Sequence, residues 1–560
     1  MRRALLTSLI AVLAINANTA VADAAYRTGR HLVVFDQPSA ARSSAALSGI
    51  FTRAGVRRAG RGVPELGVAT VRGPELALAR LRRARGVKSV SAEWARDLRR
   101  TPDDPALSTP ESEFTNGVPP GTPIQWSLAR EGFPAAWDVT TADGAIVGVI
   151  DSGVDGANPD IAGKVASADA AGTSDPLSDP DGHGTHVSGI ACAGTGNGVG
   201  IAGAGWGCRL AVVKVGSDGF GAIRDEDVVE GLRVATERGA DAINMSFGGG
   251  ASNAALREAI DFAVARGVVL VAAASNEDTD DQGSPAADLQ PNDAFNLDAG
   301  RGLVVGAAEF DDTRAGTGFG PQISLAAYGF FDDGPRGPPG LVSTYPGNPT
   351  PRESAQPAPE PPFVAPGCGC RRSFGGDERY AYLAGTSMAT PQVAALAAMV
   401  SDLNPFLTLN EKLRLLKETA RRTGGWSSEL GWGIIDAGRA VDVARRIDKS
   451  APSSSARAPR RRRARQETRR ARVRVRLRAR DAAGAPRLLP SGLAAVELFV
   501  KRGRGASRRV RTVGRSRSVL LRMRPGRYRL FTRARDRQGN REARPARADA
   551  RLLVRRPSRR

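Results

Sequence analysis

The central part of the chain is built from near-continuous apolar runs separated by segments with helical periodicity. Five such runs lie at 144–151, 209–215, 241–246, 267–275 and 302–309, and helical segments such as 225–239 and 253–267 lie between them. Strands that are covered on both faces lose the alternation of polar and apolar residues, so this order predicts a parallel sheet flanked by helices. The expected fold class is α/β.

The region before this sheet has shorter elements. Strands are predicted at 31–36, 66–72 and 87–94, and helices at 39–55 and 74–86. This βαββαβ-like order predicts a small open-faced sheet, so we assign residues 25–100 to a separate α+β domain. A stretch rich in Pro, Asp, Ser and Thr follows and leads into the central domain, which we place at 101–447.

The last part of the chain has a period of two. Residues 471–481, ARVRVRLRARD, alternate apolar residues with arginine, and strand-and-turn patterns continue to residue 540. We expect a C-terminal all-β sandwich of immunoglobulin-like type at 471–560. The arginine-rich residues 448–470 are expected to form a disordered basic linker, and the Pro- and Gly-rich residues 331–376 a long surface insertion in the central domain.

The first residues have the pattern of a secretory signal peptide. Arg2 and Arg3 precede a short apolar run, and small residues suited to cleavage follow, which places the signal peptide at 1–24. The apolar run is shorter than the roughly 18 residues of a membrane span. We expect a secreted or extracellular protein; a membrane anchor is the alternative.

Charge is distributed unevenly along the chain. The formal net charge is +22, but residues 1–100 carry +12, residues 101–450 carry −21 and residues 451–560 carry +31. This asymmetry indicates separate modules. The basic tail suits polyanions or the cell envelope, with a genomic bias toward arginine as the alternative; no aromatic stacking pattern accompanies the arginines, so nucleic-acid recognition is not indicated.

The four cysteines are Cys192, Cys208, Cys368 and Cys370. An even count in an exported chain permits disulfides. Proximity suggests the pairs Cys192–Cys208 and Cys368–Cys370, although four cysteines allow three pairings. Their spacing is not that of a zinc site.

Three motifs carry candidate chemistry. Asp151 ends an apolar strand, where sites form in open parallel sheets, or it caps a helix. His183 and His186 lie in a glycine-flanked motif; a metal pair is the alternative, without a third ligand nearby. Ser387 precedes the apolar helix expected at 390–403, where the helix dipole favours a developing oxyanion, or it caps that helix. Asp, His and Ser in this order form a known catalytic arrangement.

On these motifs the chain resembles the subtilisin-like serine proteases (subtilases) over roughly residues 120–445. The resemblance rests on DSGVD, HGTHVSG, INMSFGG, AAASNE and GTSMATP, in that order. Residues 25–100 resemble the family's inhibitory propeptide. The resemblance implies a secreted serine endopeptidase that works through an acyl-enzyme and is made as a self-processing zymogen, with processing near residues 97–105.

The resemblance also implies roles for single residues. Ser387 matches the nucleophile, His183 the general base and Asp151 the carboxylate that orients it, while Asn276 matches the side chain that donates to the oxyanion. Ser275 stands where the family commonly has glycine, which narrows the pocket or shifts the backbone.

Substrate binding follows from the same comparison. The segment that pairs with the substrate backbone as an added strand matches Ser246, Phe247, Gly248 and Gly249, and Gly283 matches the floor of the specificity pocket. Glu277 and the acidic central domain either favour basic substrates or are merely solvated.

No cofactor is expected for the chemistry. Asp160 and Asn197 match a structural Ca²⁺ site of the family, but no N-terminal carboxylate is evident around Val118, so the site is weakened or missing. The expected partners are protein or peptide substrates and the chain's own propeptide, and we expect a monomer. One rival interpretation is an inactive surface-binding scaffold, which the intact Asp151, His183, Asn276 and Ser387 disfavour. The other is a different serine-dependent hydrolase or ligase, which the propeptide-like region disfavours.

Overall fold

The computed structural model describes residues 25–37, 44–60, 62–96, 102–172, 174–216, 223–332, 334, 336–354, 370–421, 424–514 and 518–558. The predicted signal peptide 1–24 and Cys368 lie outside these residues. Residues 1–100 and 101–560 form two compact units. Among the described residues, no helix has the length and apolar character needed to cross a bilayer.

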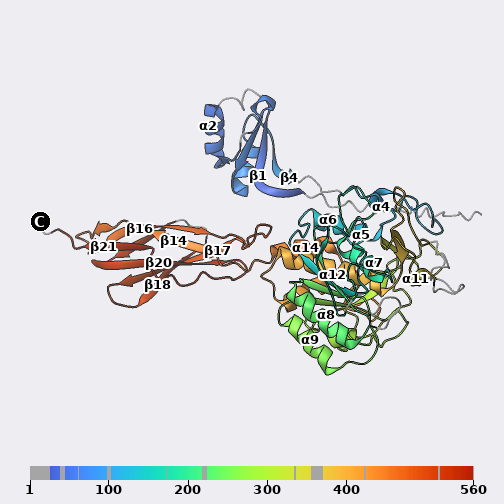
Figure 1. Cartoon of the computed structure of the whole chain (residues 1–560). Helices are drawn as coiled ribbons and strands as arrows, with labels where there is room; N and C mark the ends of the chain where they lie inside the picture. Colours follow the sequence, from blue (N-terminus) through green and yellow to red (C-terminus); the bar gives the residue numbers. More distant parts are fainter. Residues whose placement is uncertain are drawn as a thin grey trace, which may run out of the picture. The chain divides into compact units, whose positions relative to one another are not determined.

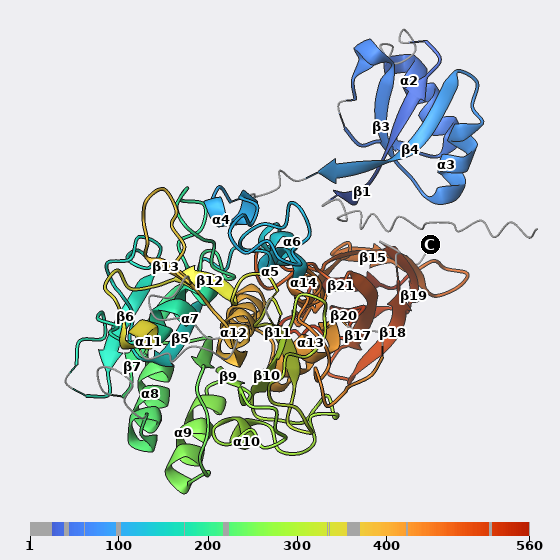
Figure 2. The same cartoon turned by 90° about the vertical axis from the view of Figure 1, so that its right-hand side faces the viewer.

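The N-terminal unit is a four-stranded antiparallel sheet with helices on one face (Figures 1 and 2). The strands β1 (Ala25–Phe35), β2 (Arg57–Arg58), β3 (Val68–Arg72) and β4 (Val87–Arg96) have the order β2-β3-β1-β4. Val33 of β1 lies opposite Ala69 of β3, and both are buried. They pack with helices α2 (Ser44–Ala54) and α3 (Glu75–Arg82) in one apolar core. The predicted α+β architecture is confirmed.

The second unit contains a parallel sheet of seven strands in the order β11-β10-β9-β8-β5-β7-β6. Its strands are β5 (Ile146–Asp151), β6 (Val165–Ala170), β7 (Arg209–Lys214), β8 (Ala242–Met245), β9 (Val269–Ala273), β10 (Leu303–Ala308) and β11 (Leu325–Tyr328). All of its neighbouring strand pairs are parallel. The α/β fold class predicted from the apolar runs is confirmed.

Helices cover both faces of this sheet. Val149 of β5 packs in a core with α7 (His183–Cys192) and α12 (Thr386–Leu403), whereas the next residue, Ile150, packs in a second core with α8 (Asp225–Glu237) and α9 (Ala254–Val264). Consecutive apolar residues on a strand therefore serve opposite faces, which is why these strands show no alternation. Further helices complete this part: α4 (Pro105–Ser108), α5 (Ser127–Arg130), α6 (Phe133–Trp137), α10 (Ala286–Leu289), α13 (Leu409–Thr419) and α14 (Ala437–Arg446).

Residues 331–376 are not only a surface insertion, as we expected. β12 (Leu341–Thr344) is buried, pairs antiparallel with β13 (Tyr380–Leu383) and packs against α7; α11 (Pro351–Ser354) follows it. The strand was not predicted because its four residues, LVST, are too few to show a period and lie among many Pro and Gly residues.

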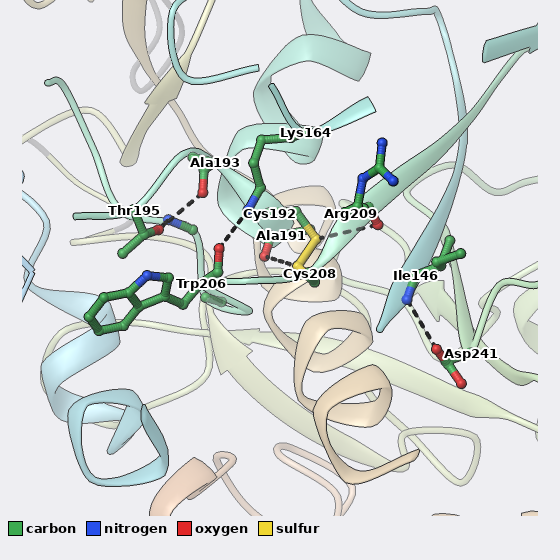
Figure 3. The surroundings of a disulfide bond; sticks show 12 residues. Ile146, Lys164, Ala191, Cys192, Ala193, Thr195, Trp206, Cys208, Arg209 and Asp241 are labelled. Atoms are coloured by element: carbon green, nitrogen blue, oxygen red, sulfur yellow. Dashed lines mark hydrogen bonds between the residues drawn. A yellow bond between two sulfur atoms is a disulfide. The ribbon is translucent and has the colours of Figure 1, made fainter. Parts of the chain in front are cut away.

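A disulfide joins Cys192, at the end of α7, to Cys208, just before β7 (Figure 3). Both residues are fully buried. This pairing, expected from proximity, is confirmed. Cys370 is also disulfide-bonded, and its pairing with Cys368 stays a prediction because Cys368 is not among the described residues.

The C-terminal region forms two β-sheets that share one apolar core. The first contains β14 (Ser453–Arg457), β16 (Ala471–Arg480) and β19 (Ser518–Met523). The second has the order β15-β21-β20-β17-β18, with strands β15 (Arg461–Arg463), β17 (Leu493–Arg502), β18 (Ser507–Val513), β20 (Gly526–Asp536) and β21 (Ala550–Arg555).

The disordered linker predicted at 448–470 is wrong. β14 pairs antiparallel with β16, and β15 pairs parallel with β21, so much of this stretch belongs to the two sheets. Composition misled the prediction, because the arginines of these strands face outward while Ala456 and Ala464 fill the core.

Candidate active site

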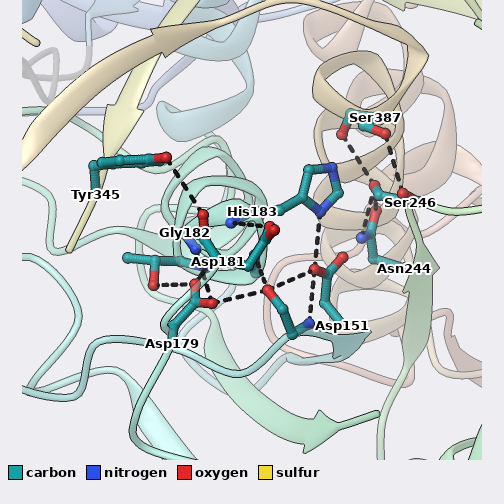
Figure 4. Close-up of polar contacts among 12 residues, drawn as sticks. Asp151, Asp179, Asp181, Gly182, His183, Asn244, Ser246, Tyr345 and Ser387 are labelled. Carbon is teal, nitrogen blue, oxygen red and sulfur yellow. Dashed lines mark hydrogen bonds and ion pairs between the residues drawn. The ribbon is translucent and has the colours of Figure 1, made fainter. Parts of the chain in front are cut away.

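The fold brings Asp151 and His183 together at the carboxyl edge of the parallel sheet (Figure 4). Asp151 ends β5 and is 3% exposed, while His183 is the first residue of α7. Asp151 Oδ1 lies 2.8 Å from His183 Nδ1 and also accepts the Ser152 N–H at 2.8 Å. A carboxylate held at Nδ1 orients the ring and favours a free Nε2 that can accept a proton.

Sequence reasoning missed the polar network that fixes these two residues. The Asp179 carboxylate accepts hydrogen bonds from Ser152 Oγ at 2.9 Å, from the Gly182 N–H at 2.9 Å and from Thr185 Oγ1 at 2.6 Å. Asp179 is buried, and this burial raises the pKa of its carboxyl group. Asp179 lies four residues before His183, and only its position in SDPDGHG could have indicated this tie between the strand end and the helix start.

Ser387 occupies the first turn of α12, facing the same cleft. Its Oγ donates to the Ser246 carbonyl at 3.0 Å, and Ser246 Oγ donates back to the Ser387 carbonyl at 3.0 Å. The alternative that Ser387 caps the helix is wrong, since the N-cap is Gly385 and Ser387 lies inside the helix. Among the described residues, no hydrogen bond joins Ser387 to His183; such bonds are often long in ligand-free sites and tighten when substrate binds.

Asn276 lies beside the start of α12, in the loop after β9. Its Oδ1 accepts hydrogen bonds from the Thr386 N–H at 2.9 Å and from Thr386 Oγ1 at 2.8 Å. Two donors on one oxygen fix which way the amide faces, so the Nδ2 group is left to donate. The role of Thr386 in orienting Asn276 was not predicted, because a threonine at the start of a helix gives no sequence signal for such a contact.

These residues line one cleft with a volume of ≈ 1080 Å³. Phe247, Gly248 and Gly249 line it together with Gly283, whereas Ser246, which also reaches the cleft, is buried and bonded to Ser387. Among the described residues that line the cleft, none is lysine or arginine and four carry carboxylates: Asp151, Asp181, Glu277 and Asp281.

Gly283 is a position that only glycine fits. Its φ is +60°, and a Cβ there would lie 2.8 Å from the Gly249 Cα. Next to Gly283 a backbone hydrogen bond joins the two segments, in which the Gly249 N–H donates to the Ser284 carbonyl at 3.1 Å. This close approach holds the glycine-rich segment 248–250 against residues 283–284.

Ser275 and His186 have structural contacts. Ser275 Oγ accepts the Glu277 N–H at 3.0 Å, which fixes the turn that carries Asn276. His186 is fully buried, and its Nε2 lies 3.1 Å from the Leu341 carbonyl and 3.0 Å from the Ala381 carbonyl. A metal pair formed by His183 and His186 is therefore not supported.

Asp160 and Asn197 come together in a second place, with a carboxylate that sequence reasoning missed. Asn197 Nδ2 donates to Asp160 Oδ1 at 2.8 Å, and Asp104 accepts the Gly196 N–H at 2.8 Å and the Asn197 N–H at 3.4 Å. The N-terminal carboxylate thus comes from Asp104 rather than from residues around Val118. Its signal was weak, because Asp104 lies in a Pro- and Asp-rich stretch that reads as a link.

This group has the donors that a calcium ion prefers. Asp104 is 1% exposed and Asp160 0%, and neither forms an ion pair with the described residues. Burial, with a smaller contribution from Asp160, raises the pKa of Asp104 to about 6, and burial also raises the pKa of Asp160. Buried carboxylates that resist ionisation, next to an amide oxygen, fit a hard cation that would stabilise their charged forms.

Comparisons with known proteins show what this chain is similar to. The subtilase family profile matches residues 142–433. The chain is 28% identical to thermitase from Thermoactinomyces vulgaris over 61% of this chain and 99% of thermitase. It is 30% identical to subtilisin BL from Lederbergia lenta over 56% of this chain and 97% of that protein. A solved protease structure from Pseudoalteromonas arctica has 25% identity and a TM-score of 0.46, with 62% of this chain and all of that chain covered.

A parallel α/β sheet with an Asp-His pair and a serine at a helix start defines a serine hydrolase. The chain belongs to the subtilase family and is a serine-type endopeptidase. Subtilases need no cofactor for catalysis and commonly bind structural calcium.

Proposed function

We propose that the protein is a secreted zymogen of a serine endopeptidase that uses Asp151, His183 and Ser387. The observation that carries this proposal is the 2.8 Å contact between Asp151 and His183 in the cleft that Ser387 also lines. His183 takes the proton of Ser387 Oγ as that oxygen attacks a peptide carbonyl, and then gives it to the leaving amine. Water, activated by the same histidine, hydrolyses the acyl-enzyme.

The N-terminal unit is the inhibitory propeptide in this proposal. It has its own apolar core and is joined to the second unit near the stretch where we expect processing, 97–105. If processing occurs before residue 103, the mature enzyme keeps two contacts with the loop at 196–198. Asp103 accepts the Gly198 N–H at 3.0 Å, and Asp104 accepts the Gly196 N–H at 2.8 Å. The basic charge of residues 1–100 complements the acidic residues 101–450, which include the peptidase domain.

Intact-mass analysis over time, with a casein assay alongside, tests this function. We expect the purified chain to lose its N-terminal unit and then digest casein. A chain that stays intact and leaves casein undigested, even after another protease has removed the N-terminal unit, contradicts the proposal.

Asn276 supplies the oxyanion donor together with the Ser387 N–H. Replacing it in Asn276→Leu should lower kcat about 100- to 1000-fold and change KM little, because the donor acts on charge that develops in the transition state. Steady-state kinetics on a peptide anilide measure both constants. If KM instead rises about 100- to 1000-fold while kcat stays unchanged, Asn276 contributes to ground-state binding and not to the transition state.

Calcium held by Asp104, Asp160 and Asn197 should stabilise the peptidase domain, residues 101–447. At about 100 times its Kd, the ion adds about 2.7 kcal/mol to the free energy of unfolding, so Tm should rise by about 4 °C over that in chelator. Differential scanning fluorimetry on the Ser387→Ala chain measures this shift without autolysis. Asp160→Asn should remove the response, whereas Asp278→Asn, an exposed carboxylate elsewhere, should keep it.

A further inference from the structure

One face of the C-terminal domain is covered by arginine. Along β16, Ala471, Val473, Val475 and Leu477 are buried, while the arginines between them are exposed. Because alternate residues of a strand point to the same side, five arginines follow one another at intervals of about 6.7 Å. They are Arg472, Arg474, Arg476, Arg478 and Arg480.

The neighbouring strands extend this row into a surface. Arg457 of β14 lies opposite Arg476, and Arg522 of β19 lies opposite Arg472. Residues directly opposite in antiparallel strands share a face, so these two arginines join the five of β16. We call the seven residues the arginine face; the other outward residues of these strands are serines and Leu520, and none is acidic.

The arginine face has no charge partner in the part of the chain that the structure describes. None of its seven side chains forms an ion pair or a hydrogen bond with the described residues. Surface arginines of the peptidase part differ, since Arg233 binds Glu230 and Glu237, and Arg414 binds Asp298 and Glu418. Like charges placed opposite one another destabilise a sheet, so the fold itself does not account for this surface.

A groove continues the arginine face. It has a volume of ≈ 1130 Å³, shares Arg457 with the face, and is lined by five further arginines: Arg460, Arg504, Arg527, Arg529 and Arg551. The one carboxylate that lines it, Asp549, already accepts hydrogen bonds from Thr532 N–H at 2.7 Å and Thr532 Oγ1 at 2.6 Å. The arginine face and the groove meet at Arg457, and we call the two together the cationic track.

The shape of this track selects among anionic partners. Guanidinium groups at regular intervals bind phosphate groups bidentately along a linear polymer. The face carries no aromatic side chain on which bases could stack, and its residues lie on three strands of one sheet rather than on a helix that could enter the major groove of DNA. Leu520 is its only large apolar residue, too little to insert into a bilayer.

We propose that the arginine face and its groove bind a linear phosphate-bearing polymer of the cell envelope, in which sugars or polyols are joined by phosphodiesters. Binding holds the endopeptidase at the cell surface. This inference does not depend on the catalytic roles proposed above, because it uses only residues of the C-terminal domain.

The test measures binding of the full-length Ser387→Ala chain to immobilised poly(glycerol phosphate) at several salt concentrations. A variant with Arg474→Gln, Arg476→Gln and Arg478→Gln should bind at least about tenfold more weakly and with a smaller dependence on salt. The matched control carries Arg508→Gln, Arg511→Gln and Arg544→Gln, which removes the same charge from exposed positions outside the track. It should bind within about twofold of the parent chain if position rather than net charge determines affinity.

Three results would overturn the proposal. Equal losses of affinity in the two triple variants would show that net charge alone determines binding. A parent chain that does not bind the polymer would contradict the proposal directly. Tighter binding to duplex DNA, or to vesicles that contain acidic phospholipid, would assign the surface to a different partner. If the face variant does not fold, Arg476→Gln alone, with Arg511→Gln as its control, answers the same question by a loss of about threefold.

Discussion

Ser387→Ala should abolish proteolysis and leave the chain unprocessed. The substitution removes the oxygen that attacks the carbonyl, and loss of the nucleophile in a triad of this kind lowers kcat by about a millionfold. The Asp151–His183 pair stays in place, but it then has no group to activate. Intact mass should show the full N-terminal unit after days, and casein should remain undigested.

Ser401→Ala is the matched control for this variant. Ser401 lies in the same helix, is buried, and donates to the Ala397 carbonyl at 3.0 Å, just as Ser387 donates to the Ser246 carbonyl. Each replacement removes one buried hydroxyl and one hydrogen bond, so the free energies of unfolding should fall by a similar amount, about 1 kcal/mol. Processing by the Ser387→Ala chain at the rate of the Ser401→Ala chain would exclude Ser387 as the nucleophile.

Asp151→Asn should lower kcat by about 10⁴-fold at neutral pH while the fold is kept. The carboxylate accepts a hydrogen from His183 Nδ1 and thereby leaves Nε2 free. An asparagine can turn its NH₂ group toward Nδ1, which places the ring proton on Nε2, where it can no longer accept the proton of Ser387. Burst kinetics with an ester substrate should show that the acylation step is the slowed one.

Asp181→Asn separates this effect from a simple loss of charge. Asp181 also lines the cleft and accepts the His183 backbone N–H at 3.2 Å, a bond that an amide oxygen makes equally well. We expect kcat to stay within about tenfold of the parent value, since the change acts on the field in the cleft and not on the tautomer. Equal losses in the two variants would show that Asp151 acts through charge alone.

Structural features that follow from repeating or alternating residues could be predicted from the sequence, whereas features that depend on contacts between distant segments could not. The apolar runs predicted the parallel sheet and five of its seven strands, though not β6 and β11, and short motifs singled out Asp151, His183 and Ser387. Asp104 could not be found in this way, because its partners lie more than ninety residues away in the loop at 196–197. The high arginine content also led to the wrong prediction of a disordered linker. The residues of β14 and β15 do not themselves indicate that these strands pair with β16 and β21.

The pairing of β14 and β15 has a consequence for the lifetime of the protein. A subtilase grips its substrate as an extended strand, so it needs backbone N–H and C=O groups that are not already bonded. Residues 453–457 and 461–463 are each paired with one neighbouring strand, β16 and β21, so this arginine-rich stretch has to leave its sheet before it can extend in the acidic cleft. The two strands are therefore protected for as long as the C-terminal sheets remain folded, and loss of that fold would expose them to the enzyme's own cleft.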